Sequence, residues 1–174
     1  AADKTVTFGG LTLTGTGAGN YTLNKTSLTS TGTIARRALT LGAVAAQSKT
    51  YDGTTSADTS KFGAVLNNVV AGEENLVKAT ATGEAYNSKD VAAASTIDYT
   101  GVALAGAEAG NYTLAATTAQ GVGTISRRAL TVDTVAAQSK TYDGNTSADA
   151  SQFHATLGNV VTGEENRVTA TASG

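Results

Sequence analysis

The side chains of this sequence that could do chemistry are its acids, its tyrosines and a single histidine. There is no cysteine, so thiol nucleophiles, thiolate metal sites and disulfides are excluded. His154 is the only histidine, and the sequence pairs it with neither a nucleophile nor a second base. No paired carboxylates of the kind that hydrolases use are present either. We therefore expect no catalytic residue, no enzyme activity and no cofactor.

Calcium is the metal ion that the acids are best suited to bind, because it takes several carboxylate and carbonyl oxygens. The candidate ligands are Asp52, Asp58, Glu73, Glu74, Glu164 and Glu165. None of them belongs to an Asp-x-Asp-x-Asp loop or a glycine-rich nonapeptide. We interpret them as solvated acids of turns and expect no metal site.

The elements that position these side chains are repeated along the chain at a fixed offset of 91 residues. Residues 1–83 align with residues 92–174 without a gap and agree at 51 of 83 positions. The stretch AAQSKTYDG, for example, begins at Ala45 and again at Ala136. Copies at a fixed period are typical of structural arrays, in which each unit contacts its neighbours.

The local patterns favour strands and turns over helices. Residues 77–82 alternate apolar and polar side chains, and residues 97–100 and 102–105 do the same on either side of Gly101, which predicts antiparallel strands. We also prefer a strand to a helix between Ser60 and Val70, because glycine and asparagine interrupt the helical spacing.

Two short motifs are interpreted as turns closed by a packed tyrosine. An Asp-Gly pair supplies positive φ angles for a tight hairpin, and a Gly-Asn pair suits a left-handed turn. We assign no ligand to these motifs and expect their tyrosines to be buried. They comprise Tyr51, Asp52, Gly53, Tyr142, Asp143 and Gly144 in the first kind, and Gly19, Asn20, Tyr21, Gly110, Asn111 and Tyr112 in the second.

Three signals occur together in a fixed order: SKTYDG with its copy, LNNVVAGEE, and AGNYTL before TISRRALT. Together they resemble the YDG-type repeats of large bacterial haemagglutinin-like surface adhesins. The resemblance implies all-β modules in tandem within a very long exported protein, and an extracellular or cell-surface location. We expect elongated, antiparallel, β-sandwich-like or β-grasp-like repeats of 91 residues that form a rod-like array.

Two divisions into units fit the period. In the first, residues 35–125 form a complete repeat, residues 1–34 are the C-terminal part of the preceding one and residues 126–174 the N-terminal part of the next. In the second, residues 1–83 and 92–174 are two units joined by the linker 84–91. We prefer the first, because repeats of the resembled family begin at the Arg-Ala-Leu-Thr strand. Partial units would expose sheet edges, which predicts head-to-tail pairing between copies.

Two functions remain for such a module. It is either a stalk that projects an adhesive tip from the cell, supporting adhesion or biofilm formation, or a repeat that itself binds matrix or host glycans. The chain has six tyrosines, three phenylalanines and no tryptophan, which is few for sugar platforms, so we prefer the stalk. The net charge of −2 argues against a nucleic-acid partner, and no long apolar run suggests membrane insertion. The expected partners are neighbouring repeats, other copies and extracellular polysaccharide.

Overall fold

The computed structural model describes residues 3–173, and within that range the chain is all-β with no α-helix. The all-β prediction is therefore confirmed. A β-grasp needs a helix across its sheet, so that form of the prediction is wrong. The strands are β1 (Lys4–Gly9), β2 (Ser27–Gly32), β3 (Arg37–Val44), β4 (Gln47–Thr50), β5 (Ala64–Asn67), β6 (Lys78–Thr80), β7 (Gly83–Tyr86), β8 (Thr96–Thr100), β9 (Ala103–Ala105), β10 (Tyr112–Leu114), β11 (Thr118–Ser126), β12 (Thr131–Val135) and β13 (Ala155–Gly158). Single turns of 3-10 helix occur at η1 (Ala18–Asn20), η2 (Thr59–Lys61), η3 (Ala109–Asn111) and η4 (Ala150–Gln152).

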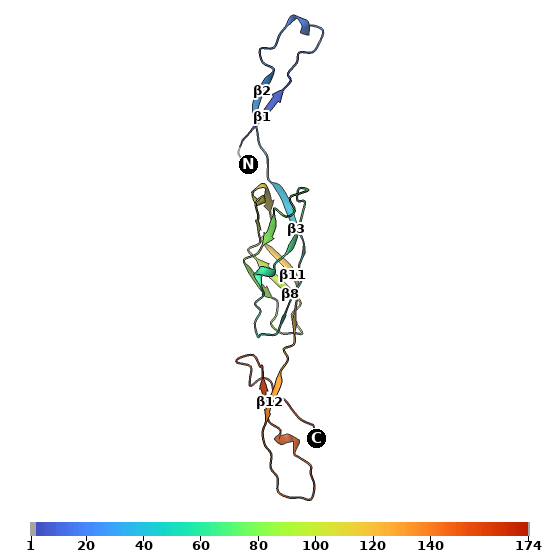
Figure 1. Ribbon diagram of the computed structural model, residues 1–174, viewed down its shortest axis with the longest axis vertical. Helices are drawn as coiled ribbons and strands as arrows, with labels where there is room; N and C mark the ends of the chain where they lie inside the picture. The colour runs from blue at the N-terminus through green and yellow to red at the C-terminus, as the bar shows by residue number, and fades with distance from the viewer. Residues whose placement is uncertain (1–2, 174) are drawn as a thin grey trace.

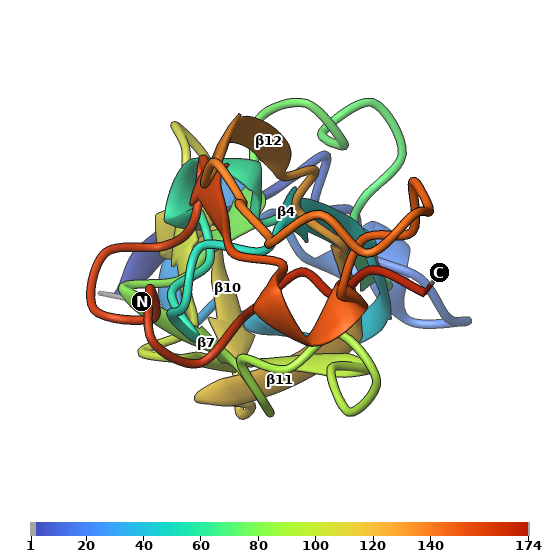
Figure 2. The same ribbon diagram turned by 90° about the horizontal axis from the view of Figure 1, so that it is seen from below.

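Three parts follow one another along the longest axis of the molecule (Figure 1). The hairpin β1–β2 lies at one end, the strands β3 to β11 form a central body, and the pair β12–β13 lies at the other end. Viewed from below in Figure 2, the three parts project onto one another. The central body alone contains more than one sheet.

The sheets of the central body join its first strands to its last. One sheet has the order β10-β3-β5, a second has the order β4-β11-β8-β7, and β6 pairs with β9. The pairs β10–β3 and β11–β4 are parallel, so the expectation of antiparallel strands is wrong for them. Parallel neighbours need a long crossover connection, and here the rest of the unit is that connection. Alternation of side chains along a strand does not reveal such a distant partner.

The strands on either side of Gly101 exist, but they do not pair with each other. β8 lies between β7 and β11, and β9 pairs with β6. Gly101 has a φ of 62°, and the next residue, Val102, is buried and donates its N–H to Thr117 O at 3.0 Å. The chain therefore turns into a second sheet at this point instead of folding back as a hairpin. Between Ser60 and Val70 the structure has η2 and the strand β5, so the preference for a strand is confirmed over four residues.

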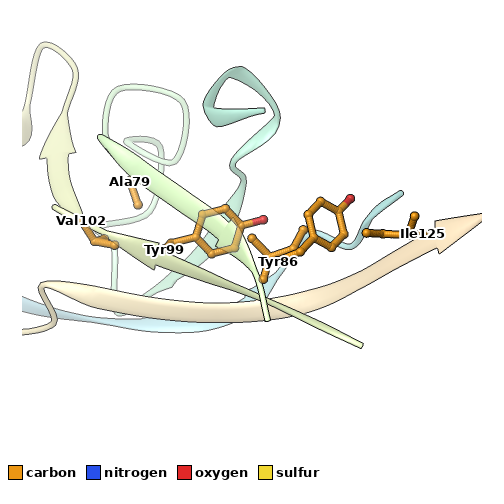
Figure 3. Close-up of a cluster of buried hydrophobic side chains, with 6 residues drawn as sticks. Ala79, Tyr86, Tyr99, Val102 and Ile125 are labelled. Atoms are coloured by element: carbon orange, nitrogen blue, oxygen red, sulfur yellow. The ribbon is translucent and has the colours of Figure 1, made fainter. Parts of the chain in front are cut away.

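The main core lies between the sheets of the central body and is built on two buried tyrosines, Tyr86 and Tyr99 (Figure 3). Gly123 on β11 lies against Tyr86 and Ile97. A Cβ atom there would lie 2.4 Å from Ile97 Cγ1 and 2.9 Å from Tyr86 Cε1, so only glycine lets β11 approach this closely. The buried members of this cluster are Ala79, Tyr86, Ile97, Tyr99, Val102 and Ile125. A second cluster consists of Leu39, Val77 and Tyr112.

The two end parts repeat pieces of the central body without its core. β1 and β2 pair in the same register as β8 and β11, yet Phe8 is exposed where its equivalent, Tyr99, is fully buried. Likewise, Gln47-Ser48-Lys49-Thr50 forms β4, whereas the identical residues 138–141 form no strand. β4 pairs with β11, and among the described residues nothing occupies the corresponding place beside 138–141. The same sequence therefore becomes a strand only where its partner is present.

Candidate functional site: the Tyr-Asp-Gly turn and the contact between units

The Tyr-Asp-Gly turn of the central body is organised around the ammonium group of Lys49. Its Nζ lies 2.8 Å from Asp52 Oδ1 and donates to the carbonyl oxygens of Thr54 at 2.8 Å and Ser56 at 2.9 Å. Asp52 Oδ1 also accepts the N–H of Thr54 at 2.9 Å. Gly53 has a φ of 80°, which explains the need for glycine there. The lysine thus closes the loop by binding both its acid and its backbone.

The same arrangement recurs in the second copy. Lys140 Nζ lies 2.9 Å from Asp143 Oδ1 and donates to Asn145 Oδ1 and the Ser147 carbonyl oxygen, each at 2.8 Å, and Gly144 has a φ of 79°. The loop therefore forms without the strand pairing that surrounds the first copy. Sequence analysis assigned no role to this lysine, although its unchanged spacing to the aspartate in both copies was a usable signal.

The carboxyl groups of these loops are held in their charged form. Burial raises the pKa of Asp52, but hydrogen bonds from Lys49 and Thr54 outweigh burial and leave that pKa below its ordinary value. The hydrogen bond from Lys140 likewise lowers the pKa of Asp143. Both carboxylates therefore serve as hydrogen-bond acceptors for their own loops.

Tyr51 links the central body to the part that follows it. Its hydroxyl donates to Glu164 Oε1 at 2.7 Å, and Lys89 Nζ lies 5.8 Å from the centre of its ring. A Cβ atom on Gly53, two residues after Tyr51, would lie 2.9 Å from Val161 Cγ1, so the turn and the 160–165 segment are in close contact. The hydrogen bond to Glu164 raises the pKa of Tyr51. Its copy, Tyr142, is 92% exposed.

The left-handed turn that we predicted at the glycine of the Gly-Asn-Tyr motif is absent from both copies. Gly110 and Gly19 do not adopt positive φ; the left-handed glycines are Gly106 and Gly15, four residues earlier. The reason is that Ala-Gly-Asn forms a turn of 3-10 helix in each copy, η3 and η1, which needs negative φ angles. The left-handed residue therefore lies before this turn.

The tyrosine that follows η3 is packed. Tyr112 is 3% exposed and lies against Leu39 and Val77. Its hydroxyl donates to the carboxylate of Glu73 and accepts the N–H of Val70 at 3.2 Å. In the other copy, Tyr21 is 73% exposed. The first glutamate of each GEEN turn thus accepts a tyrosine hydroxyl, Glu73 from within its own unit and Glu164 from the preceding one.

The acids considered for calcium are used by their own turns. Glu74 Oε2 accepts the N–H of Gly72 at 2.9 Å, and Glu165 Oε2 accepts that of Gly163 at 2.8 Å. Asp58 caps η2 by accepting the N–H of Ser60 at 3.0 Å. Within residues 3–173, no three acids or histidines lie close enough together to hold a metal ion. His154 is exposed on the surface.

Each Arg-Arg pair contributes a second repeated contact. Arg37 Nη2 donates to Asn68 Oδ1 at 2.5 Å, and Arg128 Nη2 donates to Asn159 Oδ1 at 2.6 Å. Both asparagines have positive φ, 73° and 65°, and each donates back to the carbonyl oxygen of the alanine that follows the arginine, Ala38 or Ala129. These arginines therefore fix the turn after β5 and β13.

An open hollow of about 380 Å³ lies where the central body meets the last part of the chain. Tyr51 and Val91 line it from one side, and Leu130, Val160, Val161, Glu164 and Val168 line it from the other. The charged side chains of Asp90, Arg127, Arg128 and Glu164 also line the hollow. The described part of the chain has no helix long and apolar enough to span a membrane.

Part of the central body matches a known protein family. Residues 35–119 match the family model of the YDG domain, a range that starts just before β3 and ends within β11. Comparisons with curated proteins and with solved structures gave no significant match. The match therefore supports a YDG domain within the central body, over residues 35–119.

Proposed function

We propose that this chain is a spacer module of a long extracellular or cell-surface bacterial protein, in which YDG domains follow one another as a stalk. The observation that carries the proposal is the contact between consecutive units, in which Tyr51 of one unit binds Glu164 of the next at 2.7 Å. A spacer has to keep its length, which requires that consecutive units hold a fixed orientation to each other. Contacts between nearest neighbours can fix this orientation without any other partner.

The unit of this stalk, in our proposal, is residues 35–125. The pairing of β10 with β3 and of β11 with β4 supports this division, because the last strands of that range close onto its first strands. In an array, residues 1–34 and 126–174 then belong to the preceding and the following unit. Linker 84–91 of the alternative division contains the end of β7, which pairs with β8 inside the central body.

Direct binding of glycans by each repeat has less support. Sugar platforms need exposed aromatic rings, and in the central body Tyr86, Tyr99 and Tyr112 are buried. Tyr51 is half-buried, with its hydroxyl occupied by Glu164. The highly exposed tyrosines, Tyr21 and Tyr142, lie in the end parts. In an array, we expect them to be packed as their copies Tyr112 and Tyr51 are in the central body.

Small-angle X-ray scattering of covalent arrays with one, two, three and four copies of the 91-residue unit tests this proposal. A stalk predicts that the maximum dimension increases by the same amount with each added unit. A maximum dimension that grows only slowly, as for units that collapse onto one another, would contradict it. The same arrays on a panel of polysaccharides should show no binding that increases with the number of units.

A further inference from the structure

The two Asp-Gly pairs are the places where the backbone of this chain is chemically most reactive. Glycine has no side chain to shield its own nitrogen, so that nitrogen can attack the carboxyl carbon of the aspartate before it. Asp52-Gly53 and Asp143-Gly144 are the only Asp-Gly pairs in the sequence, and no Asn-Gly pair is present. Each glycine has a positive φ, which a residue with a side chain rarely adopts. The turn therefore keeps a reactive pair in both copies.

The reaction of such a pair converts aspartate into isoaspartate and needs only water. The nitrogen of Gly53 forms a bond to Cγ of the protonated Asp52 carboxyl group. One water molecule leaves, made from the hydroxyl group of the acid and the proton of the N–H group, and a five-membered succinimide ring remains. Water then opens the ring at either carbonyl carbon. One opening restores aspartate, and the other gives isoaspartate, whose main chain is one carbon atom longer.

The attacking nitrogen is free in both copies. Among residues 3–173, neither the N–H group of Gly53 nor that of Gly144 makes a hydrogen bond. Asp52 and Asp143 are exposed, so water reaches the carboxyl groups. The backbone and the solvent therefore do nothing to prevent the reaction at either turn.

The carboxyl group under attack, in contrast, is held in both copies. Asp52 Oδ1 lies 2.8 Å from Lys49 Nζ, and it accepts the N–H and the hydroxyl group of Thr54, each at 2.9 Å. Asp143 Oδ1 lies 2.9 Å from Lys140 Nζ. An ammonium group at this distance favours the charged carboxylate. A carboxylate resists attack, because its negative charge repels the electron pair of the nitrogen and its oxygen atoms are poor leaving groups.

We propose that Asp52-Gly53 and Asp143-Gly144 are sites of succinimide formation, and that Lys49 and Lys140 protect them by holding each aspartate as a carboxylate. Each lysine precedes its aspartate by the same spacing. Without the ammonium group, a larger fraction of the carboxyl group is protonated, and the free glycine nitrogen attacks it.

Isoaspartate in the first turn would disturb the contact between the central body and the part that follows it. Tyr51 donates to Glu164, and Gly53 lies against Val161. An additional main-chain carbon between Tyr51 and Gly53 changes the separation of these two contacts, so the turn no longer matches both partners. The inference goes beyond the spacer function, because it concerns covalent change within a turn and holds for a unit of any array or of none.

Peptide mapping of the whole chain after prolonged incubation at pH 7 tests the proposal, because electron-transfer fragmentation distinguishes isoaspartate from aspartate at each pair separately. In Lys49→Met, we expect isoaspartate at Asp52 to accumulate several-fold faster than in the parent, with the rate at Asp143 unchanged. Lys140→Met should give the reverse pattern. The second turn lies outside the sheets of the central body, so the result for Lys140→Met does not depend on the stability of that body.

The pH profile distinguishes protection by charge from a general loosening of the turn. Burial raises the pKa of Asp52, but hydrogen bonds from Lys49 and Thr54 outweigh it and place this pKa below its ordinary 3.8. At pH 7 only the small protonated fraction reacts, and removing the ammonium group increases that fraction. As the pH falls toward 3.8, both proteins become protonated, so the ratio of the two rates should approach one. A turn that is merely more mobile would keep the same ratio at every pH.

The matched control is Lys61→Met, which removes an exposed contact to Asp58 and should change the rate at neither Asp-Gly pair. Equal rates at Asp52 in the parent and in Lys49→Met would overturn the proposal. A rate change at both pairs in either variant, or a rate ratio that does not depend on pH, would overturn it as well. None of these results affects the spacer function, which the scattering of covalent arrays tests independently.

Discussion

The hydroxyl of Tyr51 donates to the carboxylate of Glu164 at 2.7 Å, across 113 residues of sequence. Glu73, the copy of Glu164, accepts Tyr112 inside its own unit. One position of the repeat is therefore an acceptor both within a unit and between units. The same glutamate position therefore makes one contact inside the central body and one between the central body and the part that follows it.

Removing the Tyr51 hydroxyl should loosen the contact between units without unfolding either one. In Tyr51→Phe, we expect the backbone amides of residues 161–167 to exchange with solvent faster, because the turn that carries Glu164 loses its bond to the central body. Hydrogen exchange followed by mass spectrometry measures this. Tyr142→Phe is the matched control and should leave exchange unchanged, since Tyr142 is exposed; equal effects of the two variants would contradict the account.

The two copies of one core position should differ strongly in their contribution to stability. Tyr99 is fully buried, whereas its copy, Phe8, is 55% exposed. We expect Tyr99→Ala to lower the free energy of unfolding by about 3 to 5 kcal/mol, and Phe8→Ala by less than about 0.5 kcal/mol. Urea denaturation of the two variants checks this. A loss for Phe8→Ala as large as that for Tyr99→Ala would mean that the hairpin β1–β2 has a core of its own.

Lys49 should contribute more to stability than other lysines of the central body. Its ammonium group binds Asp52 and two backbone carbonyl oxygens, and its side chain is only 17% exposed. Lys49→Met is expected to cost about 1 kcal/mol or more. Lys61→Met removes only an exposed contact to Asp58 at 3.5 Å and should cost close to nothing. Thermal unfolding of both variants makes the comparison, and equal midpoints would exclude the role given to Lys49.

Glu84 should make the stability of the central body depend on pH. Both of its carboxylate oxygens are buried and have no hydrogen-bond partner among the described residues. Burial, and after it the negative charge of Asp58, raises the pKa of Glu84 above its ordinary 4.5. Because the folded state then holds this proton more tightly than the unfolded state, the contribution of Glu84 to stability is fully present below pH 4.5 and is lost as the pH rises through its folded pKa.

The variant Glu84→Gln has no charge to bury and should lack this part of the pH dependence. We expect the free energy of unfolding of Glu84→Gln, minus that of the parent, to increase from pH 4 to pH 7, so that the variant gains stability relative to the parent. Denaturant titrations at several pH values measure the difference. Asp3→Asn, which changes an exposed acid, is the control. A constant difference between Glu84→Gln and the parent over this range would show that Glu84 is not buried as a charged group.

The sequence was sufficient for the all-β class. The expectation that the motif tyrosines are buried holds for Tyr112, but it is wrong for Tyr21 and Tyr142, which are 73% and 92% exposed. The sequence was insufficient for the parallel pairs β10–β3 and β11–β4, because alternation along a strand reports which face is buried and not which distant strand lies beside it. The role of Lys49 was missed for a related reason. A lysine in a polar loop is ordinarily solvated, and only the folded loop shows its carbonyl oxygens converging on one ammonium group.

Residues 47–50 and 138–141 show most clearly that local sequence alone cannot predict every strand. Their sequences are identical, but only the first forms a strand. Local preference is the same in both places, so the difference comes from β11, which pairs with the first copy. No reading of four residues can predict a strand whose formation depends on a partner more than 70 residues away.

The most direct test of the account is single-molecule stretching of a covalent array of the 91-residue units. If residues 35–125 form one mechanical unit, the array should unfold in evenly spaced steps, one per unit, each lengthening the chain by roughly 300 Å, the extended length of such a unit, less its folded length. Steps of irregular size, or steps that correspond to pieces much shorter than one repeat, would contradict the claim that the chain is built from independent spacer units.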